Sequence, residues 1–253
     1  MSELSFYLGT HEPSWLRSAD VPLFVSHRRL ARLKTLHPAT CRWALDSGGF
    51  TELSLHGKWV TSAEGYAAAA ADYMTTVGNL DFAAIQDWMC EPFMLQQTGL
   101  TVRQHQERTV ASYLQLRDLA PGVPWLPVLQ GWTLADYMTC ADLYAAAGVD
   151  LTLLPRVGLG SVCRRQNTIR IGMLVSVLSG LGLKLHGFGV KTSGLSLYGA
   201  HLASADSMAW SLDARHAAPL PGCTHKNCAN CLIYAAIWRD QLLGRHVLSG
   251  YAA

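Results

Sequence analysis

Three carboxylates in this sequence follow short apolar runs and stand beside small or polar residues. Asp46 opens the string Asp46-Ser47-Gly48-Gly49-Phe50, Asp87 lies in Gln86-Asp87-Trp88, and Asp206 precedes Ser207. Two carboxylates can exchange a group on a sugar carbon, because one attacks the carbon while the other transfers a proton. A lone Asp in such a place is more often a helix cap or a turn former. The chemistry therefore depends on a fold that brings these residues together.

A second reactive group lies near the C-terminus, where Cys223, His225, Cys228 and Cys231 fall within nine residues. Three thiolates and an imidazole complete the tetrahedral ligand set of a structural zinc site. The chain has seven cysteines, and this odd number together with the close spacing favours a metal site in a reducing compartment over a disulfide framework. We expect a structural Zn²⁺ with no open coordination position, which argues against a zinc hydrolase.

The elements that must position these residues alternate along the chain. Runs of β type cover Leu4–Leu8, Val21–Ser26, Arg42–Asp46, Phe82–Asp87, Trp125–Gln130, Leu151–Arg156, Leu185–Val190 and Ala203–Trp210. Helical spacing covers Ser62–Val77, Thr101–Leu119, Thr133–Ala147, Asn167–Gly180 and, after the cysteines, Leu232–Leu243. Eight alternating repeats predict an α/β fold, a (β/α)8 TIM barrel in one domain over residues 1–253, with 219–253 as a zinc-binding subregion. Barrel enzymes build their sites at the carboxyl ends of the strands, so the strand-end residues should meet at one mouth.

Composition gives weaker indications. Half of the 253 residues are hydrophobic, but no apolar run is long enough for a membrane span, and no signal peptide is indicated. We therefore expect a cytoplasmic protein. The net charge of +2 is too small to indicate a nucleic-acid partner by itself, although the pairs Arg28-Arg29 and Arg164-Arg165 could bind phosphate oxygens. The alternative is that both pairs are ordinary solvated charges.

The string Asp46-Ser47-Gly48-Gly49-Phe50 resembles the signature of the tRNA-guanine transglycosylases, and further elements follow in that family's order. These are Asp87, Val128-Leu129-Gln130-Gly131, Val157-Gly158-Leu159-Gly160, Gly187-Phe188-Gly189-Val190, the Asp206 strand and the cysteine cluster. The chain is far shorter than the bacterial tRNA enzymes, and Thr51 stands where they usually have Gln. Its size and the strings Thr10-His11-Glu12-Pro13 and Ser207-Met208-Ala209-Trp210-Ser211 are more similar to the compact phage and bacterial branch that installs 7-deazaguanines in DNA.

The resemblance implies a role for each strand-end residue. Asp206 matches the nucleophile and Asp46 the proton-transfer residue. Guanine presents one carbonyl acceptor together with N1–H and 2-amino donors, and these could be satisfied by Gln130, the Gly158 N–H and Asp87 as a set. The substrate-binding set is Ser47, Gly48, Phe50, Asp87, Gln130, Gly131, Gly158 and Leu159. Phe50, Trp88 or Trp132 could sandwich a flipped base, although such aromatics are more often core.

The family's usual fourth zinc ligand is a late histidine, for which His246 is the candidate. If the intervening segment is helical, His246 lies about 20 Å along the axis from Cys231, so His225 is the better choice.

The implied substrates are DNA and a free 7-deazaguanine base, such as 7-cyano-7-deazaguanine, and the barrel could form a homodimer. A tRNA substrate is the nearest alternative. A catalytically silent nucleic-acid-binding or partner subunit of the same fold is another, and the presence of both Asp46 and Asp206 argues against it.

Overall fold

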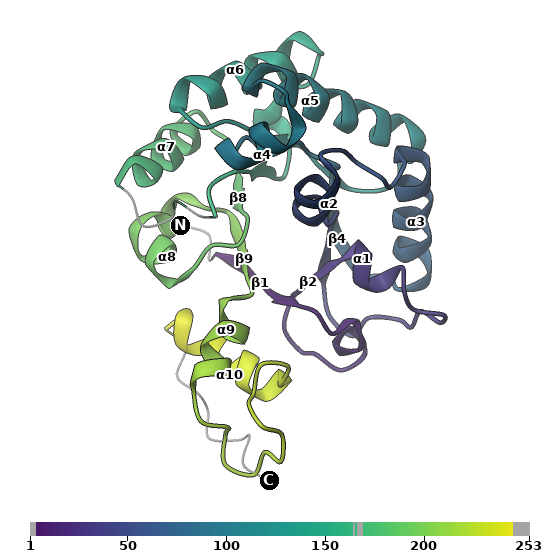
Figure 1. Cartoon of the computed structure of the whole chain (residues 1–253), viewed down its shortest axis with the longest axis vertical. Coiled ribbons are helices and arrows are strands. Elements are labelled where there is room, and N and C mark those ends of the chain that lie inside the picture. The colour runs from purple at the N-terminus through teal and green to yellow at the C-terminus, as the bar shows by residue number, and fades with distance from the viewer. Residues whose placement is uncertain (1–3, 164, 166–168, 245–253) are drawn as a thin grey trace.

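The computed structural model describes residues 4–163, 165 and 169–244. In this part of the chain, nine parallel strands form one sheet in the order β5-β4-β3-β2-β1-β9-β8-β7-β6. The strands are β1 Ser5–Thr10, β2 Leu23–Ser26, β3 Trp43–Asp46, β4 Leu80–Ala84, β5 Trp125–Leu126, β6 Val128–Leu129, β7 Val157–Leu159, β8 Leu185–Gly187 and β9 Ser204–Ser207. Helices surround the strands in a ring (Figure 1). The predicted TIM-like barrel is confirmed.

The barrel closes at a single proline. The sequence predicted one strand over residues 125–130, but Pro127 divides it into β5, which pairs with β4, and β6, which pairs with β7. Proline has no N–H to give to a ladder, although its carbonyl still accepts a hydrogen bond from Gly158 N at 2.8 Å. The two ends of the sheet are thus consecutive pieces of one segment.

Three helices of the outer ring begin at residues whose side chains cap them. Ser62 caps α3 (Ala63–Thr76), and capping boxes at Thr101 and Thr133 start α5 (Val102–Leu119) and α6 (Leu134–Ala146). The remaining helices of the barrel are α1 His27–Leu30, α2 Gly49–His56, α4 Pro92–Thr98, α7 Ile169–Gly180 and α8 Thr192–Tyr198. Helices α3, α5, α6 and α7 confirm the four helices predicted before the cysteines, apart from the start of α7, since Asn167 lies outside the described residues.

Two apolar layers flank the strands. The larger one fills the space between the strands and the outer helices. The smaller one lies inside the barrel and consists of Tyr7, Phe24, Ala44, Phe82 and Leu126, with Phe188 packed against it. This inner layer is the floor beneath the carboxyl ends of the strands.

Several predicted strand boundaries were wrong, and the run predicted over Leu185–Val190 ends at Gly187. Residues Leu151–Leu153 form a 3-10 turn in place of a strand, because Asp150 accepts hydrogen bonds from the Thr152 amide and hydroxyl; β7 follows it. The fourth run ends at Ala84, so Asp87 lies in the loop beyond it. The last run ends at Ser207, and Trp210 belongs to α9 (Ala209–His216), where its indole N–H donates to the Gly9 carbonyl at 2.8 Å.

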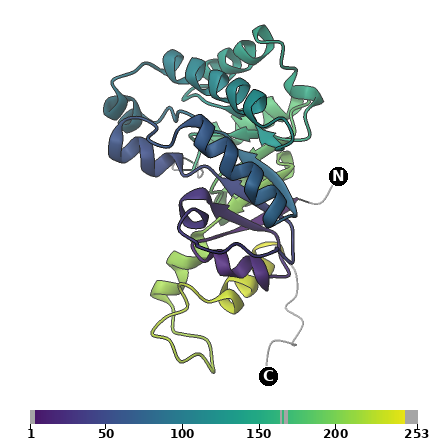
Figure 2. The same ribbon diagram turned by 90° about the vertical axis from the view of Figure 1, so that its right-hand side faces the viewer.

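The C-terminal part lies outside the ring. After α9 a loop carries the cysteines, and α10 (Leu232–Leu242) packs against α9 and β1. Figures 1 and 2 show α9 and α10 on the side of the barrel opposite α5 and α6. Within the described residues, no helix combines the length and apolar character needed to span a membrane.

Candidate active site

A cavity of about 300 Å³ opens at the carboxyl ends of the strands. That volume is at the lower end of the range for small-molecule sites. Six residues predicted from the sequence line it: Asp46, Ser47, Phe50, Asp87, Gln130 and Asp206. They come from the ends of β3, β4, β6 and β9, so segments far apart in the sequence converge on one space.

Asp206 is held at the end of β9 and is 6% exposed. Its Oδ1 accepts a hydrogen bond from the Gly189 amide at 3.0 Å, in the turn after β8. The Nε2 atom of His186, a fully buried residue of β8, lies 3.4 Å from the same oxygen, and His186 Nδ1 lies 2.9 Å from Ser204 Oγ. Both contacts involve Oδ1, and Asp206 lines the cavity.

Asp46 has different surroundings. Its carboxylate receives hydrogen bonds from the Ser26 hydroxyl and the Gly48 amide. Burial raises its pKa, and the negative charge of Asp206 raises it further, whereas those hydrogen bonds and Arg28 act in the opposite direction. A carboxyl group with a raised pKa holds a proton more readily near neutral pH, as a general acid must.

Gly48 shapes this corner because its φ is +81°, in the left-handed region. A Cβ there would also come within 2.8 Å of the Arg28 side-chain stem. Glycine meets both demands, since it has no Cβ and adopts positive φ at little cost. Gly48 itself lines a second cavity beside the first.

Asp87 and Gln130 form the inner wall. Burial raises the pKa of Asp87 to about 7, although the hydrogen bond that Gln130 Nε2 donates to Asp87 Oδ2 lowers it. The Ser161 hydroxyl lies 2.7 Å from Gln130 Oε1 and 2.8 Å from Glu91 Oε2. Glu91 and Ser161 also line the cavity, and the sequence interpretation assigned a role to neither.

Three predicted substrate-binding residues are placed differently. The Gly158 amide, expected to meet guanine, donates to the Pro127 carbonyl inside the sheet, and Leu159 packs in the outer core. Gly131 lies against α6, where a Cβ would meet Asp136 at 2.8 Å. The loop wall is formed instead by the next four residues, Gly160, Ser161, Val162 and Cys163.

Of the three aromatics considered for stacking, Phe50 lines the cavity. It is 40% exposed, and its ring centroid is 6.0 Å from that of Phe93. Trp88 is buried beneath the Arg108 guanidinium, 4.5 Å from its ring, and Trp132 lies beneath Arg165 at 3.7 Å. Phe24, Phe188 and Met208 supply further apolar wall.

The predicted arginines separate into two situations. Arg28 and Arg29, both on the short α1, line the second cavity of about 240 Å³ with Arg32, His11 and Asp46. Arg165 instead ties two loops together, because its guanidinium donates to the Trp132 carbonyl at 2.6 Å and the Ser161 carbonyl at 3.1 Å. Arg164 lies outside the described residues.

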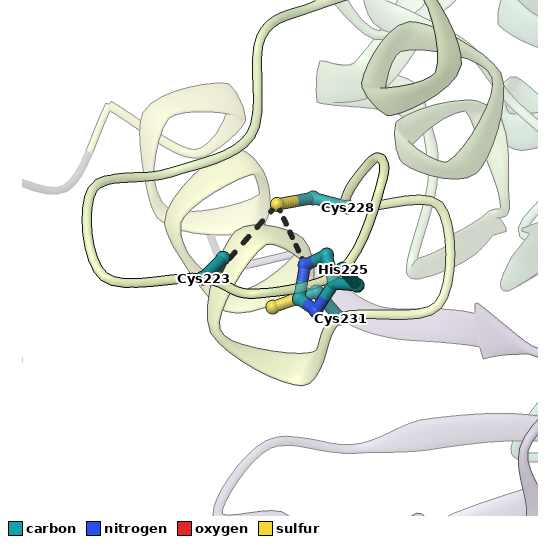
Figure 3. A group of neighbouring side chains, drawn as sticks. All are labelled: Cys223, His225, Cys228 and Cys231. Atoms are coloured by element: carbon teal, nitrogen blue, oxygen red, sulfur yellow. Dashed lines mark hydrogen bonds between the residues drawn. The ribbon is translucent and has the colours of Figure 1, made fainter.

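The cysteine cluster is compact. The ligand atoms of Cys223, His225, Cys228 and Cys231 all lie within 4.8 Å of one another (Figure 3). His225 Nε2 is 3.2 Å and Cys223 Sγ 4.0 Å from Cys228 Sγ. Soft thiolates with one imidazole suit zinc, so these residues can hold it. None of the four lines the active-site cavity. His246 lies outside the described residues.

The sequence interpretation missed His186, Glu91 and Ser161 for one reason. Each is a common residue within or beside an apolar run, with no spacing that marks it. Only the fold brings His186 beneath Asp206 and Glu91 to Ser161, 70 residues away along the chain.

Comparison with known proteins yields one family. A family model described as DpdA, DeoxyPurine in DNA protein A, matches residues 1–248. No curated protein matches the chain.

Proposed function

The chain belongs to the DpdA family, DNA-guanine transglycosylases related to the tRNA-guanine transglycosylases, and from this premise we propose that it replaces guanine in DNA with a 7-deazaguanine such as 7-cyano-7-deazaguanine. The observation that carries the proposal is the pair of unlike carboxylates at one cavity. Asp206 is held through one oxygen by the Gly189 amide, while burial and the Asp206 charge raise the pKa of Asp46.

The first half of the reaction releases guanine. Asp206 attacks C1′ of the deoxyribose with its free oxygen, the bond from C1′ to N9 breaks, and its electron pair goes to the departing ring. Asp46 gives its proton to that ring, so guanine leaves as a neutral base. The product is an ester between Asp206 and C1′, which keeps the DNA strand intact.

The second half runs in reverse. A 7-deazaguanine takes the vacated place, its N9–H proton passes to the ionised Asp46, and N9 attacks C1′. The ester bond breaks, and Asp206 regains its charge. The apolar wall of Phe24, Phe188 and Met208 limits the access of water, which would otherwise hydrolyse the ester and leave an abasic site.

Base recognition belongs to the inner wall. An ionised Asp87 accepts hydrogen bonds from N1–H and the 2-amino group of a guanine-type base. The loop from Gly160 to Cys163 takes the place first assigned to Gly158 and Leu159, and Phe50 covers one face of the ring. A base reaches this cavity only when flipped out of its stack.

The second cavity suits a phosphate. Arg28, Arg29 and Arg32 surround it, and it adjoins Asp46, so a phosphate next to the flipped nucleotide would sit there. Phosphate binding by Arg164 and Arg165 stays a prediction, since Arg164 lies outside the described residues and Arg165 donates to two backbone carbonyls. Zinc held by Cys223, His225, Cys228 and Cys231 is structural in this proposal and takes no part in the exchange.

The direct test incubates purified protein with labelled guanine and either duplex DNA or tRNA. The proposal requires incorporation into DNA and a covalent protein–DNA adduct that the wild type forms and Asp206→Asn does not. Incorporation into tRNA alone would identify the alternative substrate, and binding without any exchange would identify a silent subunit. The mass of the protein in solution tests the proposed homodimer.

A further inference from the structure

Behind the carboxylate that would receive the base, four side chains form one hydrogen-bonded chain: Asp87, Gln130, Ser161 and Glu91. Gln130 Nε2 faces Asp87, while Ser161 Oγ lies between Gln130 Oε1 and Glu91 Oε2. All four are buried, and none is more than 8% exposed. The exchange mechanism gives no role to Glu91 or Ser161, and a buried carboxylate is costly unless it is paired.

The hydroxyl of Ser161 cannot satisfy all its neighbours as a donor. It has one proton and two lone pairs. The Cys90 amide donates to it at 2.8 Å, which occupies one lone pair. One proton and one lone pair remain for two groups that normally accept, Gln130 Oε1 and a Glu91 carboxylate oxygen. One of these two neighbours must therefore donate.

Two arrangements solve this count. In the first, Glu91 is a neutral acid that donates to Ser161, Ser161 donates to the Gln130 carbonyl, and the Gln130 amide nitrogen donates to an ionised Asp87. In the second, the Gln130 amide is turned over: a neutral Asp87 donates to its carbonyl, its nitrogen donates to Ser161, and Ser161 donates to an ionised Glu91. The two ends of an amide have nearly the same shape, so both fit. Each arrangement contains one carboxyl proton, which is on Glu91 in the first and on Asp87 in the second.

We propose that Asp87 and Glu91 share this one proton through Gln130 and Ser161, and that Glu91 holds it when a base is bound. The inference rests on the proposed function, because it assigns Asp87 to the N1–H of a guanine-type base. An ionised Asp87 accepts from that N–H, whereas a neutral one places its own O–H there and suits a 6-aminopurine. Glu91 and the Ser161 hydroxyl thereby help to select 6-oxopurines by acting through Gln130 on Asp87.

The backbone supports this arrangement. A Cβ on Gly160 would lie 2.6 Å from Gln130 Cδ and 2.8 Å from Oε1, so only glycine allows the amide to lie where it does. Ser161 has a φ of +56°, which non-glycine residues seldom adopt. A strained serine is best explained by its hydroxyl, which joins Glu91 to Gln130.

Among the described residues, the other titratable groups that interact with the two carboxylates are Asp46, Tyr66, Cys90, Tyr137 and Tyr144. Arg165 acts on Tyr137, and Asp136 and Cys140 act on Cys90. Burial raises the pKa of the Cys90 thiol and of the three tyrosines, so these stay neutral near pH 6. Asp46 is common to the wild type and the variants below, so its contribution cancels in a comparison.

The experiment counts protons released when the zinc-loaded protein binds free 7-cyano-7-deazaguanine. Calorimetry near pH 6, in buffers of different ionisation enthalpy, gives this number. In the wild type the proton moves from Asp87 to Glu91, so binding releases almost none. Glu91→Gln cannot store the proton, and its side-chain carbonyl can accept from Ser161, so that Asp87, whose pKa burial raises, keeps its proton until a base binds. This variant should therefore release more protons than the wild type, up to about one per base bound.

Ser161→Gly cuts the chain without backbone strain and should also release about one more proton. Cys90→Ser is the control, because it alters a group beside Glu91 but leaves the four-residue chain intact; it should match the wild type. Equal proton release by the wild type, Glu91→Gln and Ser161→Gly would overturn the shared proton while leaving the proposed function standing. Failure of the wild type to bind the base would overturn both.

Discussion

The barrel mouth and the cysteine loop both contain clustered polar groups, but the two clusters differ in their expected effect on stability. At the mouth, Asp87 is buried and Asp46 is half-buried, and burial raises the pKa of each. In the loop, Cys228 and Cys231 share a small apolar cluster with Ala214, so few contacts hold it without a metal. If the proposed function holds, polar groups at the mouth oppose folding and serve chemistry, whereas those of the loop support folding by binding a metal.

The sharpest test of this comparison is Asp206→Ala. It removes the proposed nucleophile from a cavity wall, so base exchange should fall by at least about 10³-fold. Circular dichroism, melting temperature and zinc content should match those of the wild type. Undiminished exchange would end the mechanism, and a collapse of the melting temperature would show that the mouth also supports the fold.

The loop should respond in the reverse way to Cys228→Ser. Metal-binding energy is folding energy in such a cluster, so we expect loss of zinc and a stability decrease of roughly 3 kcal/mol or more, or insoluble protein. Metal analysis and thermal unfolding measure both. His225→Ala should lose zinc and His246→Ala should keep it; the opposite result would show that the fourth ligand was wrongly chosen.

Asp87→Asn should weaken binding of the base and should also change how the stability of the protein depends on pH. Burial raises the pKa of Asp87 in the folded protein from the ordinary value of 3.8 to about 7. Between these values the folded state holds a proton that the unfolded state has lost, so wild-type stability should decrease as pH rises to about 7 and then level off.

The Asn variant lacks this slope. Relative to the wild type, its melting temperature should therefore be higher at pH 8 than at pH 4, while its affinity for the base falls by about tenfold or more. If the difference in melting temperature between Asp87→Asn and the wild type is the same at pH 4 and at pH 8, the pKa of Asp87 is not raised in the folded protein.

The contrast between the regions also explains what the sequence could predict. The cysteine spacing and the string from Asp46 to Phe50 are local, so the metal cluster and one side of the cavity could be located in advance. Contacts between distant segments could not: Gly158 was expected to face the base until the pairing of β7 with β6 showed its amide engaged. The split at Pro127 and the turn at Asp150 moved strand boundaries because one missing N–H and one side-chain cap outweighed the apolar pattern.

The smallest expected effect concerns the rim arginines, where the sequence treated two pairs alike. Arg28 and Arg29 line an open cavity, so Arg28→Ala with Arg29→Ala should weaken binding of every DNA sequence alike and reduce the salt slope by about two units. Arg165 donates to the Trp132 and Ser161 carbonyls and lies over the Trp132 ring. Its guanidinium is already engaged, so Arg165→Ala should lower the melting temperature and change the salt slope little. Titrations of a DNA duplex at several salt concentrations distinguish the two. If Arg165→Ala flattens the salt dependence as much as the Arg28 and Arg29 double variant does, then Arg165 binds phosphate, and the phosphate-binding surface extends across both sides of the mouth.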